Sequence, residues 1–209
     1  MKTITIAGIE KCDFCYYVAR TLATRSNLVL VVDNSINKEL FRCMEQGMAK
    51  DEDDNYVAKK GEILYLKDIA FSQDFFAAFE YVLIYQGMNF DKEIMEKTDL
   101  IFILPDFKPE TLGKSSDMPE KAEYLLRDRA GKMTEKAAAT IIGISANRII
   151  GSVDADADDY GCYLALLCNG RQRPGSVTNG YKEMIAYTAA RIMDIPVKEA
   201  MKSVKKARG

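Results

Sequence analysis

Short, continuous apolar runs alternate with amphipathic stretches along most of the chain. Residues 28–32 read LVLVV, 81–85 read YVLIY and 100–104 read LIFIL. Strands that are apolar on both faces are typical of a parallel sheet covered by helices on both sides. The pattern therefore predicts a three-layer α/β/α sandwich whose mostly parallel sheet has about five to seven strands.

Apolar residues at helical spacing mark several segments between these runs. Phe14, Val18 and Leu22 recur every four residues in a helix predicted over 13–24, and a longer apolar face runs along 178–193. Asn34 and Ser35 follow the second strand and can cap the next helix. Further helices are expected over 37–48, 72–79, 91–97 and 134–142.

The remaining segments carry weaker strand or loop signals. Residues 163–167 fit either a strand or part of a helix. The polar segment 51–60 predicts a loop, and 105–120, with three prolines, predicts a loop or a broken helix. Further strands are expected at 2–7, 62–66 and 123–127. No linker divides the chain, so a single α/β domain is predicted over 1–196.

A basic amphipathic tail, residues 197–209, follows this domain. Val197, Ala200, Met201 and Val204 fall on one helical face, and lysines fill the other. Such a segment can lie on an anionic membrane surface, although the thin apolar face here also fits a solvated terminal helix. Peripheral membrane contact through this tail is therefore one expectation for the chain.

The composition excludes several classes of chemistry. The 209 residues include no histidine, which rules out Ser-His-Asp and Cys-His catalysis and His-ligated zinc. The net charge of −2 gives no global electrostatic case for nucleic acid, and no nucleic-acid partner is expected. No apolar run approaches the ~20 residues of a membrane span, and no signal-peptide pattern opens the sequence. A cytoplasmic protein is expected.

The loop after the first predicted strand is the place to look for a ligand, because ligands in open parallel sheets bind at the carboxyl ends of strands. A phosphate-binding loop needs several glycines, a lysine, and a hydroxyl for Mg²⁺. Gly8 and Lys11 are present, but only Ile9 and Glu10 separate them, and Cys12 takes the hydroxyl position. The motif is a degenerate phosphate loop.

The same loop is open to a second chemistry. Cys12 and Cys15 form a C-x-x-C motif at a helix start, where thioredoxin-like proteins use the helix N-terminus to lower a thiol pKa. The structural alternative is that Cys15 packs as a small apolar residue. All five prolines lie far downstream, so the cis-proline strand of the thioredoxin fold is not evident. The five cysteines are odd in number and do not suggest a disulfide framework.

The order of motifs along nearly the whole chain carries a family resemblance. MKTITIAG, Lys11 and VARTLA match a first strand, a signature lysine and the following helix. LVLVVDNS matches a second strand ending in an aspartate, here Asp33, and FEYVLIYQG a Walker B strand. The family elements that follow are matched by KTDLIFILPDFKPE, AEYLLRDRAGKMTEKAAATIIGI and NRIIGSVDADAD. The closing helix is matched by Tyr181–Met193. In this order the chain resembles the deviant-Walker ATPases of the MinD/ParA type, which implies a P-loop NTPase-like fold.

The departures from that family concern its catalytic features. The glycine-rich loop is shortened, Cys12 replaces the magnesium-binding hydroxyl, and Tyr85 stands at the Walker B aspartate position. A tyrosine does not coordinate magnesium as a carboxylate does. The resemblance therefore implies a pseudo-ATPase, a localisation or scaffold factor similar to the TadZ-like proteins of bacterial pilus and secretion machineries or to partition proteins. It also implies protein partners and a homodimer.

If nucleotide binds, the resemblance implies ATP and Mg²⁺ as cofactors and a site made of Gly8, Lys11, Cys12 and Asp33. Gly8 would admit the backbone to the phosphate, Lys11 would supply charge, and Asp33 would contact magnesium or water. In the structural alternative, Lys11 is a surface lysine and Asp33 caps a turn. Two rival functions stay open: an active ATPase whose loop rearranges, and a thiol oxidoreductase that uses Cys12 and Cys15.

An acidic run, DADADD at 154–159, opens like a calcium-binding loop. Such a loop needs a glycine at its sixth position and a glutamate at its twelfth. Here those positions hold Asp159 and Ala165. The run is therefore predicted to be a solvated acidic loop.

Overall fold

The described part of the chain is built on one eight-stranded sheet. The computed structural model describes residues 1–26, 28–46, 57–60, 62–67, 76–129, 131 and 133–207. The strands lie in the order β3-β4-β2-β5-β1-β6-β7-β8, and every neighbouring pair is parallel except β3 with β4 at one edge. Their bounds are β1 Lys2–Gly8, β2 Val29–Asp33, β3 Val57–Lys60, β4 Ile63–Lys67, β5 Tyr81–Gly87, β6 Leu100–Leu104, β7 Glu123–Arg129 and β8 Ile149–Asp154.

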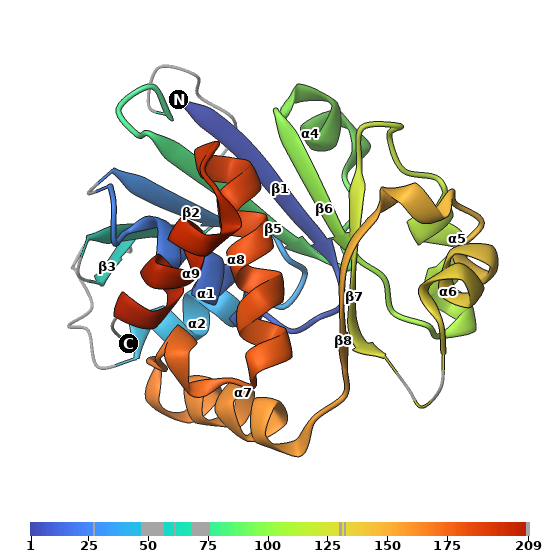
Figure 1. Cartoon of the computed structure of the whole chain (residues 1–209). Helices are drawn as coiled ribbons and strands as arrows, with labels where there is room; N and C mark the ends of the chain where they lie inside the picture. The colour runs from blue at the N-terminus through green and yellow to red at the C-terminus, as the bar shows by residue number, and fades with distance from the viewer. Residues whose placement is uncertain are drawn as a thin grey trace.

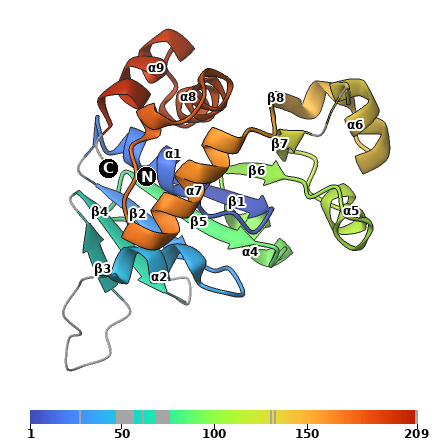
Figure 2. The same cartoon turned by 90° about the horizontal axis from the view of Figure 1, so that it is seen from below.

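Helices cover both faces of the sheet and give three layers (Figures 1 and 2). Alternate residues of β6 show the division: Phe102 and Leu104 pack with α1, α8 and α9, whereas Ile101 and Ile103 pack with α4 and α6. The helices are α1 Asp13–Leu22, α2 Glu39–Glu45, α4 Lys92–Lys97, α5 Pro109–Ser116, α6 Glu135–Ile142, α7 Ala157–Asn169, α8 Asn179–Met193 and α9 Val197–Lys206. The predicted α/β sandwich with a mostly parallel sheet is confirmed.

The central strands are the continuous apolar runs of the sequence. β2, β5 and β6 are buried along almost their whole length, because helices pack on both of their faces. β1 pairs with β5 on one side and β6 on the other, so it is the middle of this buried group. Hydrophobic periodicity therefore placed the core of the sheet correctly.

The sequence prediction differs from the structure at the edges of these elements. Of the two alternatives for residues 163–167, the helix is the one observed, because they belong to α7. Part of the predicted loop 51–60 is strand β3, whose four residues pair antiparallel with β4; residues 51–56 lie outside the described residues. Segment 105–120, predicted as a loop or a broken helix, contains the short helix α5 with Pro109 in its first turn, so the broken-helix alternative is the one observed. Most of the helix predicted over 72–79 lies outside the described residues.

Helix α2 is shorter than predicted and is capped differently. It begins after Lys38, whose left-handed φ of 52° sets the turn into the helix. Asn34 and Ser35 do not cap it; the carboxylate of Asp33 accepts the Phe41 backbone N–H in the first turn instead. The cap thus comes from the end of strand β2, which ties the helix start to the sheet.

The basic segment after Pro196 forms helix α9, which packs against α1 and α8 (Figure 1). Its apolar face is the predicted one: Ala200 and Val204 are fully buried against the core. Within the described residues, no helix is both long enough and apolar enough to cross a membrane.

Candidate functional site

The residues singled out from the sequence gather at the carboxyl edge of the sheet. Gly8 ends β1 and Asp33 ends β2, and Asp33 lies beside Tyr85 of β5 in the strand register. Gly8 has φ +121°, and a Cβ added there would lie 1.8 Å from the Leu104 carbonyl oxygen. The close approach of β1 to β6 therefore requires glycine at this position.

The start of helix α1 is capped by a carboxylate of this chain. Glu39, the first residue of α2, accepts the Cys12 backbone N–H at 3.2 Å. The other carboxylate oxygen of Glu39 accepts the hydroxyl of Tyr163 on α7 at 2.7 Å. The N-terminus of a helix is an anion-binding position, because its N–H groups are unpaired and its dipole favours negative charge. Here an internal carboxylate takes that position.

A second carboxylate lies in the shortened loop itself. Glu10 accepts the Met88 backbone N–H at 3.0 Å, just beyond the end of β5. Gly87 precedes Met88 with φ +52°, and a Cβ there would come within 2.8 Å of the same Glu10 oxygen. The glycine thus makes room for the carboxylate. The other oxygen of Glu10 is buried and forms no hydrogen bond with the described residues.

Lys11 is engaged by other side chains. Its ammonium forms an ion pair with Asp128, and it lies 5.6 Å from the ring centroid of Tyr160 on α7. Asp128 has a left-handed φ of 58°, at the point where the register between β7 and β8 shifts. An irregularity in the pairing of β7 with β8 therefore presents a carboxylate to the lysine. Neither reading of Lys11 from sequence alone, phosphate ligand or surface lysine, anticipated this partner.

Asp33 is 1% exposed and makes three hydrogen bonds. One oxygen accepts the backbone N–H and the hydroxyl of Ser35, at 3.0 and 2.6 Å, and the other accepts the Phe41 N–H at 2.8 Å. Burial raises the pKa of its carboxyl, and these donors oppose the rise. In this conformation the Asp33 carboxylate oxygens accept hydrogen bonds from the turn at Ser35 and from the first turn of α2.

Tyr85 places a buried phenol where the resembling family has an aspartate. It is 2% exposed, and its hydroxyl forms no hydrogen bond with the described residues. Burial raises its pKa well above the usual value, and Cys12 with the carboxylates of Glu10 and Glu39 raise it further. The phenol is therefore neutral and lies among acidic groups.

A buried ion pair locks the first turn of α1 to the sheet. Asp13 and Arg127 of β7 form two hydrogen bonds, and their side chains are 0% and 1% exposed. The Tyr181 hydroxyl donates to the same carboxylate at 3.1 Å, while the guanidinium lies 4.8 Å from the Tyr181 ring centroid. Burial raises the pKa of Asp13, and Arg127 opposes that rise. No local sequence pattern marks this pair, because the two residues lie far apart in sequence.

The two thiols of the C-x-x-C motif are fully buried. A hydrogen bond with Cys43, followed by burial, raises the pKa of Cys12 well above its usual value, and burial does the same for Cys15. A reactive dithiol needs an accessible thiolate of lowered pKa. Cys12 meets Cys43 of α2 and is surrounded by carboxylates, so this environment opposes thiolate chemistry.

The acidic run at 154–159 is not a solvated loop throughout. Asp156 caps α7, accepting the Asp158 backbone N–H at 2.8 Å. Asp159 is 3% exposed and accepts the N–H and hydroxyl of Thr178, the cap residue of α8. The solvated-loop prediction is therefore wrong for Asp159, whose carboxylate joins two helix starts. Among the described residues, no group of three or more Cys, Asp and Glu side chains is placed to hold a metal ion.

The residues at this edge do not fit a magnesium–triphosphate complex. The helix start that would meet phosphate already meets Glu39, the loop adds a second carboxylate, and Lys11 is neutralised by Asp128. Where the resemblance implies a hydroxyl and an aspartate for magnesium, this chain has Cys12 and a neutral tyrosine, and neither is a ligand that magnesium prefers. The sequence showed the two replacements, but the positions of Glu39 and Asp128 needed the fold.

The chain has a MinD-like P-loop NTPase fold. It matches the solved structure of the MinD cell division protein of Aquifex aeolicus with a TM-score of 0.66 at 14% identity, over 94% of this chain and 98% of that chain. It also matches the MinC:MinD cell division protein complex of the same organism, with a TM-score of 0.66 at 15% identity, over 94% and 97% of the two chains. No protein-family model and no curated protein sequence matches it. The expected fold is confirmed, and at these identities the likeness establishes the fold alone.

Proposed function

We propose that this chain is a MinD-type protein whose phosphate site is closed by its own carboxylates, and that it acts by binding protein partners rather than by hydrolysing ATP. The single observation that carries the proposal is the contact of Glu39 with the Cys12 backbone N–H at the start of α1. Glu10 and Asp128 complete the closure by occupying the loop and the lysine.

The carboxylates of Glu10 and Glu39 would repel a phosphate group at this site. Two unit charges about 4 Å apart repel by about 4 kcal/mol at an effective dielectric constant near 20, which corresponds to roughly a thousandfold in affinity. A phosphate entering this site would meet two carboxylates and would have to displace Asp128 from Lys11. Its binding would therefore be weak unless the carboxylates move.

A partner-binding role is supported by the fold and by the neighbour that it matches. One of the matched structures is a complex of MinD with MinC. We extend this to the present chain as a localisation or scaffold factor, with assignment to a bacterial pilus, secretion or partition system resting on the resemblance to TadZ-like proteins. A homodimer and peripheral membrane contact belong to the same proposal. Because the apolar face of α9 is buried, membrane contact would use its lysines rather than that face.

The first experiment is a titration with a fluorescent ATP analogue, with and without Mg²⁺. We expect no saturable binding by the wild-type protein up to millimolar nucleotide. The variant pair Glu10→Gln with Glu39→Gln keeps the size of both side chains and one acceptor oxygen on each, and removes both charges. We expect this variant to bind the analogue or inorganic pyrophosphate more tightly than wild type.

Lys11→Ala, made in both backgrounds, is the matched control. Saturable, Mg²⁺-dependent binding by wild type that is lost in Lys11→Ala would overturn the proposal and favour an active ATPase whose loop rearranges. Unchanged Tm values would show that the variants fold normally. Failure of the double Gln variant to gain any anion affinity would show that the carboxylates are not what closes the site.

A further inference from the structure

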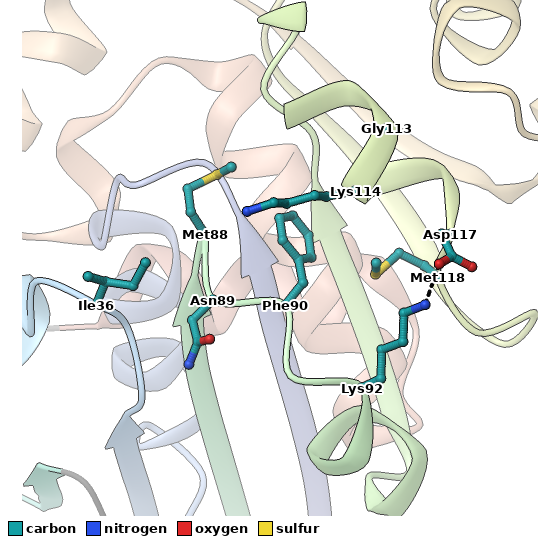
Figure 3. A pocket seen from close by; sticks show the side chains of 9 residues that line it. All are labelled: Ile36, Met88, Asn89, Phe90, Lys92, Gly113, Lys114, Asp117 and Met118. Carbon is teal, nitrogen blue, oxygen red and sulfur yellow. Dashed lines mark hydrogen bonds and ion pairs between the residues drawn. The ribbon is translucent and has the colours of Figure 1, made fainter. Parts of the chain in front are cut away.

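A cavity of about 460 Å³ opens on the other side of the carboxyl edge, between the loop after β5 and helix α5 (Figure 3). We call it the α4–α5 pocket. Its size falls within the usual range for binding cavities. It is lined by Ile36, Met88, Asn89, Phe90, Lys92, Gly113, Lys114, Asp117 and Met118. None of these residues is used in the closed phosphate site except Met88, whose backbone N–H binds Glu10.

The apolar part of the lining is large and adaptable. Met88, Phe90 and Met118 lie around the pocket in Figure 3, and Ile36 stands at its far side. Ile36 is 69% exposed, the highest value among the large apolar side chains given for the structure. Methionine side chains are flexible and polarisable, so they adapt to apolar groups of different shapes. The lining therefore suits a large apolar side chain of a partner.

The rim of the pocket carries two lysines and one aspartate, so its net charge is positive. Lys92 forms an ion pair with Asp117, which offsets its charge. Lys114 is exposed and extends across the Phe90 ring in Figure 3, and no acidic side chain of the described residues forms an ion pair with it. A lysine without an acidic partner among the described side chains, on the rim of a partly apolar cavity, is complementary to a carboxylate that arrives next to an apolar group.

We propose that the α4–α5 pocket docks a segment of a partner protein in which an acidic residue lies next to a large apolar side chain. The apolar side chain enters between Met88, Phe90 and Met118, and the carboxylate pairs with Lys114. This inference rests on the proposed partner-binding role, although it does not depend on whether the phosphate site is closed. It adds to that role a place on the fold and a chemistry for the partner.

The methionine methyl groups provide a local readout. Protein labelled with ¹³C at the methionine methyls is titrated with a short synthetic peptide in which glutamates alternate with phenylalanine and leucine. We expect the signals of Met88 and Met118 to move and those of Met184 and Met193, on the opposite face, to stay. Met88→Leu and Met118→Leu assign the two signals.

Three comparisons test the chemistry. A peptide with lysine for each glutamate, and one with serine for each apolar residue, should each bind about tenfold more weakly. Lys114→Glu should weaken the acidic peptide by about tenfold and improve the lysine peptide. Lys198→Glu, on α9, changes the net charge equally and should have no effect. Lys114 and Lys198 are both exposed, so neither variant threatens the fold.

The opposing outcomes are distinct. Equal binding of the acidic and lysine peptides, or no effect of Lys114→Glu, would overturn the proposal. Signal shifts of equal size with acetate or phosphate alone would also overturn it, because they would indicate a small-anion site. Signal shifts that depend on protein concentration without peptide would overturn it as well, because they would indicate a second copy of the chain as occupant. Nucleotide binding in the titration described above would refute the closed phosphate site and leave this result unaffected.

Discussion

Replacing Arg127 by methionine is expected to destabilise the protein strongly, because it leaves the Asp13 carboxylate buried without its counter-ion. The two side chains are 1% and 0% exposed and are joined by two hydrogen bonds. Removing one partner of such a pair costs about 3–5 kcal/mol. For a chain of this size that corresponds to a fall in Tm of roughly 6–20 °C.

The loss of folding stability in Arg127→Met should be smaller at low pH than at neutral pH. Burial raises the pKa of Asp13 and Arg127 opposes the rise, so removing Arg127 raises that pKa further. A carboxyl whose folded pKa lies above its unfolded value of about 3.9 stabilises the fold at low pH and loses that stability as pH rises through the folded value. The deficit of Arg127→Met relative to wild type should therefore shrink as the pH falls from neutral through the raised Asp13 pKa.

Urea unfolding, followed by circular dichroism at several pH values, measures both effects. Asp13→Leu combined with Arg127→Met removes both charges and should recover most of the lost free energy of unfolding, since a buried ion pair can be replaced by apolar groups of similar volume. A loss below about 1 kcal/mol in the single variant, or a double variant no more stable than the single, would refute the reasoning.

Three further predictions concern the carboxyl edge of the sheet. Gly8→Ala should abolish or severely reduce soluble expression, because its Cβ would lie 1.8 Å from the Leu104 carbonyl oxygen; a Tm within a few degrees of wild type would contradict the observed strand approach. Asp33→Ala should lower the free energy of unfolding by about 2 kcal/mol in urea titrations, since three donors lose their acceptor, whereas Asp33→Asn should lose less. In the native protein a thiol reagent should modify exposed Cys168 at once and Cys12 only after unfolding; rapid labelling of Cys12 would revive the oxidoreductase reading.

Much of the candidate site could be located from the sequence, but its chemistry could not. The strand ends placed Gly8 and Asp33 at one edge, and the loss of magnesium chemistry that the resemblance implies from Cys12 and Tyr85 stays a prediction. What stayed hidden was the set of partners. A carboxylate that comes from the next helix along the chain has no local signature at the loop that it caps.

Asp33 illustrates the difference between position and role. Its place at the end of a buried strand equally fits a ligand to magnesium and a cap. The structure decides the observed contacts, because α2 begins where its Phe41 N–H can reach the carboxylate. The same holds for Lys11, whose partner Asp128 is presented by an irregular stretch of a strand more than a hundred residues away.

The sequence by itself determined the architecture of this protein. Continuous apolar runs that alternate with amphipathic stretches favour a parallel sheet between helix layers, and the order of the motifs carried the resemblance to MinD/ParA-type proteins. Tertiary structure alone decided what surrounds the carboxyl edge. The contacts of Glu39 with the start of α1 and of Glu10 with the Met88 N–H depend on distances between segments remote in sequence, and so does the meeting of Met88, Phe90 and Met118 around one pocket. Local propensity and periodicity carry no information about those distances.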